Sequence, residues 1–387
     1  MRKRGFVVDI FERSGDELAS RGAGITPHKV LFDAFHQAGV GIEHALGVES
    51  RGRLFFAADG LVTARNDTPQ LFTSWGLLYR FLRREFPDER YFNGTEVTHI
   101  EQHESNVILR FKNGSHRPYV WVVGADGLRS TVRRCVVPEL EINYTGYVAW
   151  RGLMPESLLA KDIAEQLNDR MSFYLPPGEH LLGYTVAGPD DTLTRGQRWY
   201  NWVWYRPVAV GDAFRDLFTD TNGKLHANGT APNLIRPGVS AALRRDARHL
   251  LPSQFQAVIR HTGQPFLQPI SELGSVQLVY NRAILIGDAA FTVRPHIGLG
   301  VSKAAADAAT LATAFDQPGE PVSVALKEWE RDRLHFGNAV LERSADLGCY
   351  LSGDAKTLFE AERFKHYRQA EIVLTGIAAA TPEQFLN

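Results

Sequence analysis

One stretch decides the fold: Arg282-Ala-Ile-Leu-Ile-Gly-Asp-Ala-Ala-Phe-Thr-Val-Arg-Pro-His-Ile-Gly-Leu-Gly-Val-Ser-Lys-Ala304. Its apolar run from Ala283 to Ile286 has the length of a buried strand and stops at Gly287. The alanine-rich run from Ala304 to Ala314 has the composition of a helix. A strand, an acidic turn and a helix in this order bring a carboxylate and a helix N-terminus to one ligand.

The residues of the turn indicate what kind of ligand it binds. Asp288 can accept hydrogen bonds from hydroxyl groups. Pro295, Gly298 and Gly300 follow, and then the helix, whose first N–H groups and positive dipole end favour negative charge. An ordinary strand-to-helix turn of an α/β protein is the alternative, and the turn by itself favours neither interpretation.

The same residues resemble the second FAD-binding motif of flavin-dependent aromatic hydroxylases of the para-hydroxybenzoate hydroxylase type. In that family the motif consists of Gly-Asp, a later Pro, Gly-x-Gly and an Asp-Ala pair. This chain has Gly287-Asp288, Pro295, Gly298 with Gly300, and Asp307-Ala308. The resemblance implies that Gly287 through Gly300 bind FAD, with Asp288 holding the ribityl chain and the helix N-terminus beside the flavin ring.

A second motif precedes the first in the chain: Gly124-Ala-Asp-Gly-Leu-Arg-Ser-Thr-Val-Arg133. It matches the family's Asp-Gly-x-x-Ser-x-Val-Arg pattern at every fixed position, which are Asp126, Gly127, Ser130, Val132 and Arg133. In the family this segment lies near the FAD pyrophosphate and is linked to use of the nicotinamide cofactor. A helix capped by Asp or Ser is the alternative, and it explains Asp126 but not the whole string. The resemblance therefore makes Asp126 and Gly127 cofactor-binding candidates.

The first residues of the chain add a third element. Phe6 to Phe11 predicts a strand that ends at Glu12 and Arg13, where dinucleotide-binding folds place a carboxylate for the adenosine ribose. The glycine-rich phosphate turn should then lie ~20 residues earlier, before Met1. Either Glu12 is an ordinary surface acid, or this chain lacks a glycine-rich first strand and turn that exist upstream of Met1.

The loop after this strand also resembles the family. Arg21-Gly-Ala-Gly-Ile25 has glycines at 22 and 24, which let the backbone approach a flat ring closely. Gly24 is therefore a cofactor-binding candidate together with Glu12 and Arg13, and a loop with turn glycines is the alternative. If the first strand is missing, two neighbouring strands lack partners, and we expect a reduced affinity for FAD.

Composition excludes several classes of function. The net charge is −1 and Lys and Arg are spread throughout, which does not favour binding to nucleic acid or to an anionic membrane. No apolar run approaches the ~20 residues of a membrane span. The histidines lack metal-site spacing, so we expect no metal. Two cysteines, Cys135 and Cys349, are too few for a disulfide framework and fit a reducing compartment, so we expect a cytoplasmic protein.

The middle of the chain differs from its ends. Glu141 to Tyr280 is rich in Trp and Tyr with strand-like alternation, and Arg195 to Tyr205 predicts a strand half facing solvent and half facing a pocket or core. We expect an α/β protein with α+β elements: a dinucleotide-binding FAD domain, a mixed-sheet substrate domain and C-terminal helices. The predicted boundaries are 1–43, 67–140 and 281–350 for the FAD domain, 44–66 and 141–280 for the substrate domain, and 351–387 for a C-terminal helix and tail.

Two short stretches resemble the 2,6-dihydroxypyridine hydroxylase branch of the family, namely Tyr144-Thr-Gly-Tyr-Val-Ala-Trp-Arg-Gly152 and Pro295-His296. The resemblance implies hydroxylation of a small electron-rich aromatic or N-heteroaromatic ring with FAD, NAD(P)H and molecular oxygen, and it allows a homodimer. His296 is the catalytic candidate, as a base for a ring hydroxyl, because the ordinary pKa of histidine lies near neutrality. A structural loop histidine is the alternative.

Three functions remain open at this point. The first is an NAD(P)H-dependent hydroxylase of an aromatic or N-heteroaromatic ring. The second is another FAD-dependent oxidoreductase of the same fold, such as one that forms epoxides or attacks a polyketide. The third is a truncated, inactive chain that cannot hold FAD because the glycine turn is absent. The sequence determines neither the ring nor the choice between NADH and NADPH.

Overall fold

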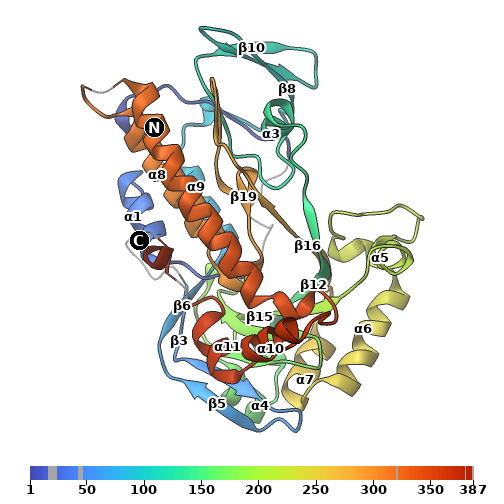
Figure 1. The fold of residues 1–387 in the computed structure, drawn as a ribbon. Helices are drawn as coiled ribbons and strands as arrows, with labels where there is room; N and C mark the ends of the chain where they lie inside the picture. Colours follow the sequence, from blue (N-terminus) through green and yellow to red (C-terminus); the bar gives the residue numbers. More distant parts are fainter. Residues whose placement is uncertain (16–23, 42–46, 320, 380, 386–387) are drawn as a thin grey trace.

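The computed structural model describes residues 1–15, 24–41, 47–319, 321–379 and 381–385. A large sheet forms one part of the molecule, and smaller sheets with two long helices form another (Figure 1). Helices and strands are mixed along the chain, which confirms the predicted α/β class with α+β elements. The predicted segment around Gly22 lies outside the described residues.

The large sheet contains eight strands in the order β19-β16-β12-β15-β14-β13-β4-β5. Their bounds are β4 (Arg53–Phe56), β5 (Val62–Asn66), β12 (Asn143–Pro155), β13 (Met171–Tyr174), β14 (His180–Val186), β15 (Trp199–Pro207), β16 (Phe266–Gly274) and β19 (Phe291–Thr292). Most neighbours are antiparallel, but β4 and β13 pair in parallel, so the sheet is mixed as predicted. This pairing joins a hairpin from early in the chain to strands that follow much later.

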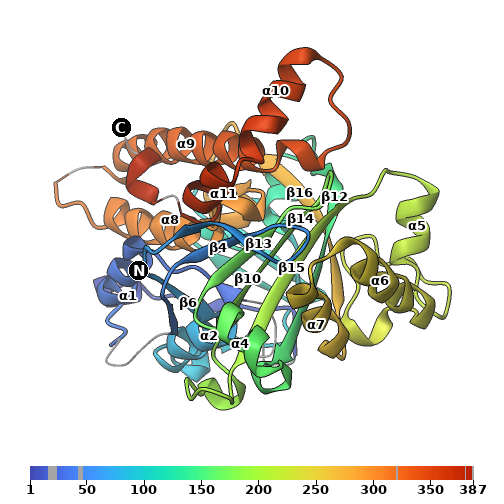
Figure 2. The ribbon, with the colours of Figure 1, turned by 90° about the horizontal axis from the view of Figure 1, so that it is seen from below.

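Both faces of this sheet are covered, and one prediction is wrong for that reason. The strand predicted from Arg195 to Tyr205 corresponds to β15, which is almost entirely buried and has no half that faces solvent. Trp202 and Trp204 pack on the side of α6 and α7, whereas Val203 and Tyr205 pack on the side of α9 and α11 (Figure 2). Alternation along this strand therefore separates two cores instead of separating core from water.

Smaller sheets carry the two sequence motifs. One is β11-β18-β17, built from β11 (Val122–Gly124), β17 (Val279–Tyr280) and β18 (Ala283–Leu285). The others are β1-β7, β10-β9-β8 and β2-β6-β3. Their strands are β1 (Ile10–Phe11), β2 (Gly24–Ile25), β3 (Val48–Ser50), β6 (Gln70–Ser74), β7 (Tyr91–Phe92), β8 (Val97–Gln102), β9 (Val107–Phe111) and β10 (His116–Tyr119). Within the described chain no backbone ladder joins β1-β7 to β11-β18.

The predicted alanine-rich helix is present and lies inside α8 (Gly300–Phe315), which runs beside the longer α9 (Val322–Leu347) (Figure 1). Their apolar faces share a core with β18, which fixes the helices against the end of that strand. The remaining α-helices are α1 (Lys29–Gln37), α2 (Trp75–Arg84), α3 (Thr131–Val136), α4 (Lys161–Leu167), α5 (Asp212–Phe218), α6 (Pro237–Leu250), α7 (Ser253–His261), α10 (Leu358–Tyr367) and α11 (Ala370–Gly376).

A buried arginine ties the C-terminal helix to the large sheet. The guanidinium of Arg53, on β4, donates to the carbonyl oxygens of Leu374 at 3.1 Å, Ile377 at 2.6 Å and Ala378 at 3.0 Å. These carbonyls lie at the end of α11, where a helix has no internal donors left. Burial lowers the pKa of Arg53 to about 10, so the side chain remains a cation at neutral pH. Arg53 thus caps the helix that closes this side of the molecule.

We expect Arg53→Met to destabilise the fold by about 3 kcal/mol, because it leaves buried carbonyls without donors. The C-terminal segment after Ser352 should also become more sensitive to limited proteolysis, measured by the rate of fragment release. Arg65→Met on the neighbouring β5 is the control, because Arg65 is exposed and contacts only Asp67 within the described chain. Equal thermal midpoints for the two variants would contradict this role of Arg53.

Candidate active site

The two motifs meet because their strands pair in parallel. Val122 to Gly124 pair with Ala283 to Leu285, and the N–H of Ile286 donates to the Gly124 carbonyl at 3.1 Å. In a parallel ladder the carboxyl ends of both strands lie at the same edge. The turns that follow, at Asp126 and at Asp288, are therefore neighbours, although they are far apart in sequence. This is the convergence that the two-motif interpretation requires.

Arg133 connects the two turns. Its guanidinium is buried and donates from Nη1 to the Ala289 carbonyl at 2.9 Å, and from Nη2 to the Leu128 carbonyl. Burial lowers its pKa, and the Asp126 carboxylate opposes that shift. The last fixed position of the second motif thus holds the backbone of the first motif in place.

Asp126 has a structural use for its carboxylate. Oδ2 accepts the N–H groups of Thr131 at 2.7 Å and Val132 at 3.1 Å, and Ser130 Oγ accepts the N–H of Arg133 at 2.9 Å. Both side chains therefore cap α3, as the alternative interpretation of this motif predicts for Asp126. Asp126 is nevertheless exposed, at the sheet edge formed by the carboxyl ends of β11 and β18. Gly127 beside it has a left-handed φ of 74°.

Asp288 presents its carboxylate to solvent at the same edge. The preceding Gly287 is buried with a φ of 61°, a conformation that favours glycine, and it turns the chain sharply after β18. The protein around Asp288 raises the pKa of its carboxyl group, the Lys303 ammonium opposes that rise and the Asp307 carboxylate adds to it. The largest cause of this rise is the neighbouring protein, which displaces water from around the carboxyl group and so disfavours its charged form.

The N-terminus of α8 follows the turn. Pro295 opens the short 3-10 helix η8 (Pro295–Ile297), and Gly298 continues with a left-handed φ of 72°. Leu299 is the N-cap residue of α8, and no side chain caps the first turn of this sixteen-residue helix. A side chain at Gly300 would meet no atom within 4 Å. The first N–H groups of α8 are therefore open to an anionic or polar ligand.

These features fit FAD. A bare helix N-terminus suits the flavin edge that becomes negative on reduction, and an exposed acceptor-only carboxylate at Asp288 suits the hydroxyls of a ribityl chain. The missing side chain at Gly300 leaves open space beside the helix N-terminus, whereas a Cβ at Gly298 would be 2.8 Å from the Cβ of Ala378. The structure contradicts none of the five residues assigned to this motif.

The segment after β2 also reaches α8. His28 Nδ1 forms a 2.9 Å hydrogen bond with Ser302 Oγ in the first turn of α8. Gly24, which opens β2, lies so close to the ring of Tyr184 that an added Cβ would be 2.5 Å from it. Gly24 is thus a close-approach glycine, but the ring that it approaches is that of Tyr184 on β14. Its predicted approach to the flavin ring stays a prediction.

Glu12 and Arg13 form a more local arrangement. Glu12 Oε1 accepts the N–H of Ser14 at 2.7 Å, and the Glu12 backbone continues the pairing with β7 through Phe92. Arg13 is exposed, and its charge helps burial to lower the pKa of Arg129, which lies within the second motif. Arg13 therefore lies near the motif edge, whereas no contact within the described chain joins Glu12 to Asp288.

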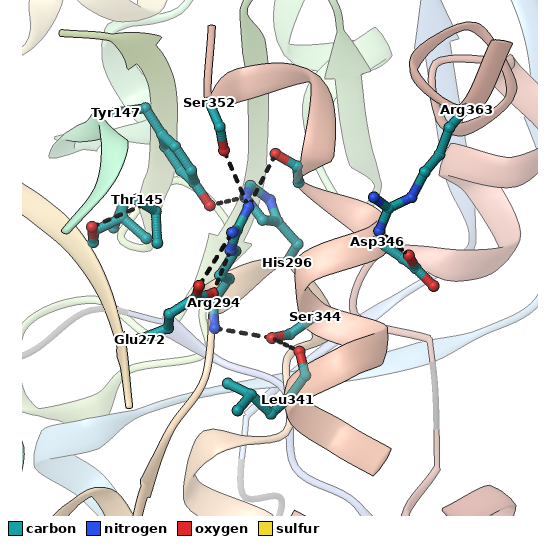
Figure 3. A network of polar contacts seen from close by, with 12 residues as sticks. Thr145, Tyr147, Glu272, Arg294, His296, Leu341, Ser344, Asp346, Ser352 and Arg363 are labelled. Atoms are coloured by element: carbon teal, nitrogen blue, oxygen red, sulfur yellow. Dashed lines mark hydrogen bonds and ion pairs between the residues drawn. The ribbon is translucent and has the colours of Figure 1, made fainter. Parts of the chain in front are cut away.

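The loop of residues 293–299, which joins β19 to α8, is called the cofactor loop below. His296 belongs to this loop and lies in a buried polar cluster between it and the large sheet (Figure 3). Its Nε2 atom is 2.9 Å from the hydroxyl of Tyr147, and its ring centroid is 4.4 Å from that of Tyr205. Its carbonyl accepts the N–H of Ala378 at 2.7 Å. Next to it, Arg294 donates from Nε to Glu272 at 2.7 Å (Figure 3). The loop is held from the sheet, from the C-terminal segment and by an ion pair.

A second histidine completes this cluster. His180 on β14 has its ring 5.6 Å from that of His296, and its Nδ1 atom is 2.6 Å from the hydroxyl of Tyr350. His296 Nδ1 and His180 Nε2 are buried and have no hydrogen-bond partner within the described chain. Buried polar atoms in native proteins nearly always have partners, so these two nitrogens are candidates to contact a substrate.

Burial keeps both histidines neutral. It is the main cause that lowers the pKa of His296 well below its usual value, with smaller contributions from His180 and Arg294. It also lowers the pKa of His180 to about 3, helped by Arg368. The stated reason for choosing His296, a pKa near neutrality, is therefore wrong. Its role as the catalytic residue remains a prediction.

Several residues of this cluster were not predicted from the sequence. Tyr147 lies in the stretch that resembles the dihydroxypyridine branch, and Tyr205 lies in the aromatic-rich strand β15. These two sequence patterns could have indicated both tyrosines as site residues. His180, Tyr350 and Arg294 carry no local signal, because only the packing of β14 and the segment after α9 against the loop brings them together.

Two kinds of feature are absent from the part of the chain that the structure describes. No group of three or more His, Cys, Asp or Glu side chains there has the arrangement of a metal site. No helix in the same ranges is long and apolar enough to cross a membrane.

Comparisons with known proteins show which family the chain resembles. An FAD binding domain-like family model matches residues 144–272. The 2,6-dihydroxypyridine 3-monooxygenase of Paenarthrobacter nicotinovorans is 30% identical over 356 residues, which cover 91% of this chain and 87% of that protein.

Solved structures show the same fold. The 2,6-dihydroxypyridine-3-hydroxylase from Arthrobacter nicotinovorans matches with a TM-score of 0.85 and 29% identity, over 92% of this chain and 90% of that one. Klebsiella pneumoniae HpxO, complexed with FAD and uric acid, matches with a TM-score of 0.73 and 20% identity, over 97% and 92% of the two chains. The chain belongs to the FAD-dependent aromatic monooxygenases, enzymes that hydroxylate aromatic or heteroaromatic rings with FAD, NAD(P)H and oxygen.

Proposed function

We propose that this enzyme hydroxylates a small, electron-rich N-heteroaromatic ring of the dihydroxypyridine class. The observation that carries the proposal is His296: its buried Nδ1 has no hydrogen-bond partner among the described residues and lies in a cluster of aromatic rings beside the cofactor loop. A hydroxyl group of a planar ring is the simplest partner for such an atom. The likeness to a 2,6-dihydroxypyridine 3-monooxygenase supports the same substrate class.

We propose the domain boundaries predicted from the sequence. The FAD domain comprises 1–43, 67–140 and 281–350, the substrate domain 44–66 and 141–280, and the C-terminal helix and tail 351–387. The parallel pairing of β4 with β13 supports the assignment of the early hairpin to the substrate domain.

We also propose a cytoplasmic location and a homodimer. Cys135 and Cys349 are free thiols, which agrees with a reducing compartment. Leu358 and Phe359, at the start of α10, are exposed apolar side chains that suit a contact between two copies.

The cofactor-binding role is proposed for the edge described above. Asp288 would accept hydrogen bonds from the ribityl hydroxyls, and the N-terminus of α8 would face the flavin ring through Gly298 and Gly300. Glu12, Arg13 and Gly24, together with Asp126 and Gly127, would contact the remainder of the cofactor. When bound, FAD supplies the redox chemistry that takes electrons from NAD(P)H and activates oxygen.

His296 would act on the substrate as a neutral hydrogen-bond acceptor. If its Nε2–H donates to the Tyr147 hydroxyl, Nδ1 is free to accept from a ring hydroxyl. Accepting this bond moves electron density into the ring, which favours attack by an electrophilic oxygen. Because the pKa of His296 is lowered well below its usual value, a full proton transfer to its imidazole would be costly. The residue therefore polarises the hydroxyl.

The substrate proposal is tested with FAD-loaded enzyme, 2,6-dihydroxypyridine, isotopically labelled oxygen and either NADH or NADPH. We expect one labelled oxygen atom in the product, measured by mass spectrometry, and none with unsubstituted pyridine. His296→Asn should lower kcat/KM by about tenfold through loss of the acceptor. His249→Asn, at an exposed position on α6, is the control. Oxidation of the nicotinamide cofactor without transfer of labelled oxygen to the pyridine ring would contradict the proposal.

The cofactor role of Asp288 gives a separate prediction. Asp288→Asn should raise the Kd for FAD by about tenfold or more, because hydrogen bonds to a charged acceptor are lost. Flavin fluorescence during titration measures this affinity without any turnover. Asp354→Asn, at an exposed position before α10, serves as the matched control and should bind FAD as the wild type does. An unchanged Kd for Asp288→Asn would remove the residue from the site.

The neutral histidines predict a dependence of stability on pH. The folded-state pKa of His180, about 3, lies below the unfolded value of 6.5, so its contribution is present above pH 6.5 and is lost as pH falls. Each such histidine should cost about 1.4 kcal/mol per pH unit below that point. His180→Asn should remove about that slope from urea unfolding curves, whereas His249→Asn should not. An unchanged slope would mean that His180 is charged in the folded protein.

A further inference from the structure

Three buried charged side chains lie directly behind the Asp288 turn. They are Lys303 and Asp307, one turn apart on α8, and Arg333 on α9. Lys303 is 1% exposed, so its ammonium is almost completely removed from water. Burying an ammonium group costs several kcal/mol unless nearby acceptors compensate it. Such a residue in the first turns of a cofactor-binding helix needs an explanation.

The acceptors of Lys303 identify its use. Its Nζ atom donates to the Gly287 carbonyl at 2.8 Å and lies 3.5 Å from Asp307 Oδ2. The same Oδ2 atom accepts the N–H of Gly287 at 2.9 Å. Both backbone polar groups of Gly287 are therefore held by side chains of α8. Because Gly287 directly precedes Asp288, this clamp sets where the Asp288 carboxylate points.

Arg333 braces the clamp from the second long helix. Its Nε atom donates to Asp307 Oδ1 at 2.8 Å, and its guanidinium lies 4.2 Å from the ring centroid of Phe336. Two cations thus meet one buried carboxylate, and the ammonium of Lys303 also acts on the carboxylate of Asp288. Arg133 adds a third buried cation on the α3 side of the same turn. Of these charges, the Lys303 ammonium favours an ionised Asp288, whereas burial and the Asp307 carboxylate raise the pKa of Asp288.

We propose that Lys303 is a positioning residue for the cofactor: through the Gly287 carbonyl and through its charge, it holds Asp288 in place and ionised for the hydroxyl groups of FAD. This inference rests on the proposed cofactor role of Asp288. Asp307 is the anchor of the clamp, and Arg333 keeps Asp307 in its place. An ionised carboxylate only accepts hydrogen bonds, which is the form that a polyol chain requires.

The test compares Lys303→Met, which keeps the stem and removes the ammonium, with Lys303→Gln, which keeps a donor and removes the charge. Lys327→Met, at an exposed position on α9, is the control. In flavin-free protein, backbone hydrogen exchange at residues 286–290 should be about tenfold faster in Lys303→Met than in the control. Lys303→Gln should retain more protection, because its amide can still donate to the Gly287 carbonyl.

FAD titration supplies the second measurement. Lys303→Met should raise the Kd for FAD by about tenfold. Without the ammonium, Asp288 takes up a proton at a higher pH, and the Asp307 carboxylate, which also raises the pKa of Asp288, remains near it. As pH is lowered, the affinity of both variants should therefore begin to fall at a higher pH than that of the wild type. A purely structural lysine would not move this profile.

The outcomes separate clearly. Wild-type exchange and affinity in Lys303→Met would overturn the inference, and so would faster exchange with an unchanged Kd and pH profile. If Lys303→Met does not fold, the pH profile of Lys303→Gln decides in the same way. None of these measurements needs hydroxylation of a ring. A protein that binds FAD as described but oxidises no heteroaromatic substrate would therefore contradict the proposed function and not this inference.

Discussion

The parallel pairing of β11 with β18 is the constraint on which the candidate site depends. It places the ends of two strands from distant parts of the chain at one edge, and the turns at Asp126 and Asp288 follow there directly. Backbone hydrogen bonds set this arrangement, so it does not depend on the side chains in the turns. Arg133 and Lys303 then act on turns that already lie together, each by donating to a backbone carbonyl.

Features that depend on local sequence were predicted well. The strand before Gly287 and the helix after Gly300 follow from an apolar run and an alanine-rich run, and both are present. The order of the motifs indicated one cofactor site because the family resemblance supplied the long-range information. The cap formed by Asp126 is also local, since its partners lie five and six residues later. Glu12 shows the limit, because its visible contacts are those of its own turn.

Features that depend on burial were predicted poorly, for one physical reason. The residues of β15 alternate as those of a half-exposed strand would, but a second core covers the face that was expected to contact solvent. His296 was chosen for the pKa of a solvated histidine, and burial removes that property. Lys303 resembles an ordinary helical lysine in the sequence. In each case the residue type indicates what a side chain can do, and the tertiary environment determines its charge and partners.

The buried groups behind the Asp288 turn are charged, whereas the buried histidines beside the large sheet are neutral. Behind the cofactor turn, charges are buried in compensated groups, with Lys303 and Arg333 on Asp307. Around His296 and His180, burial instead keeps the imidazoles neutral. This difference agrees with the roles proposed for the two sides. A cofactor with fixed polar groups gains from charges that are positioned before it binds. A planar ring attacked by an electrophilic oxygen gains from a dry pocket that polarises its hydroxyl groups without a full charge nearby.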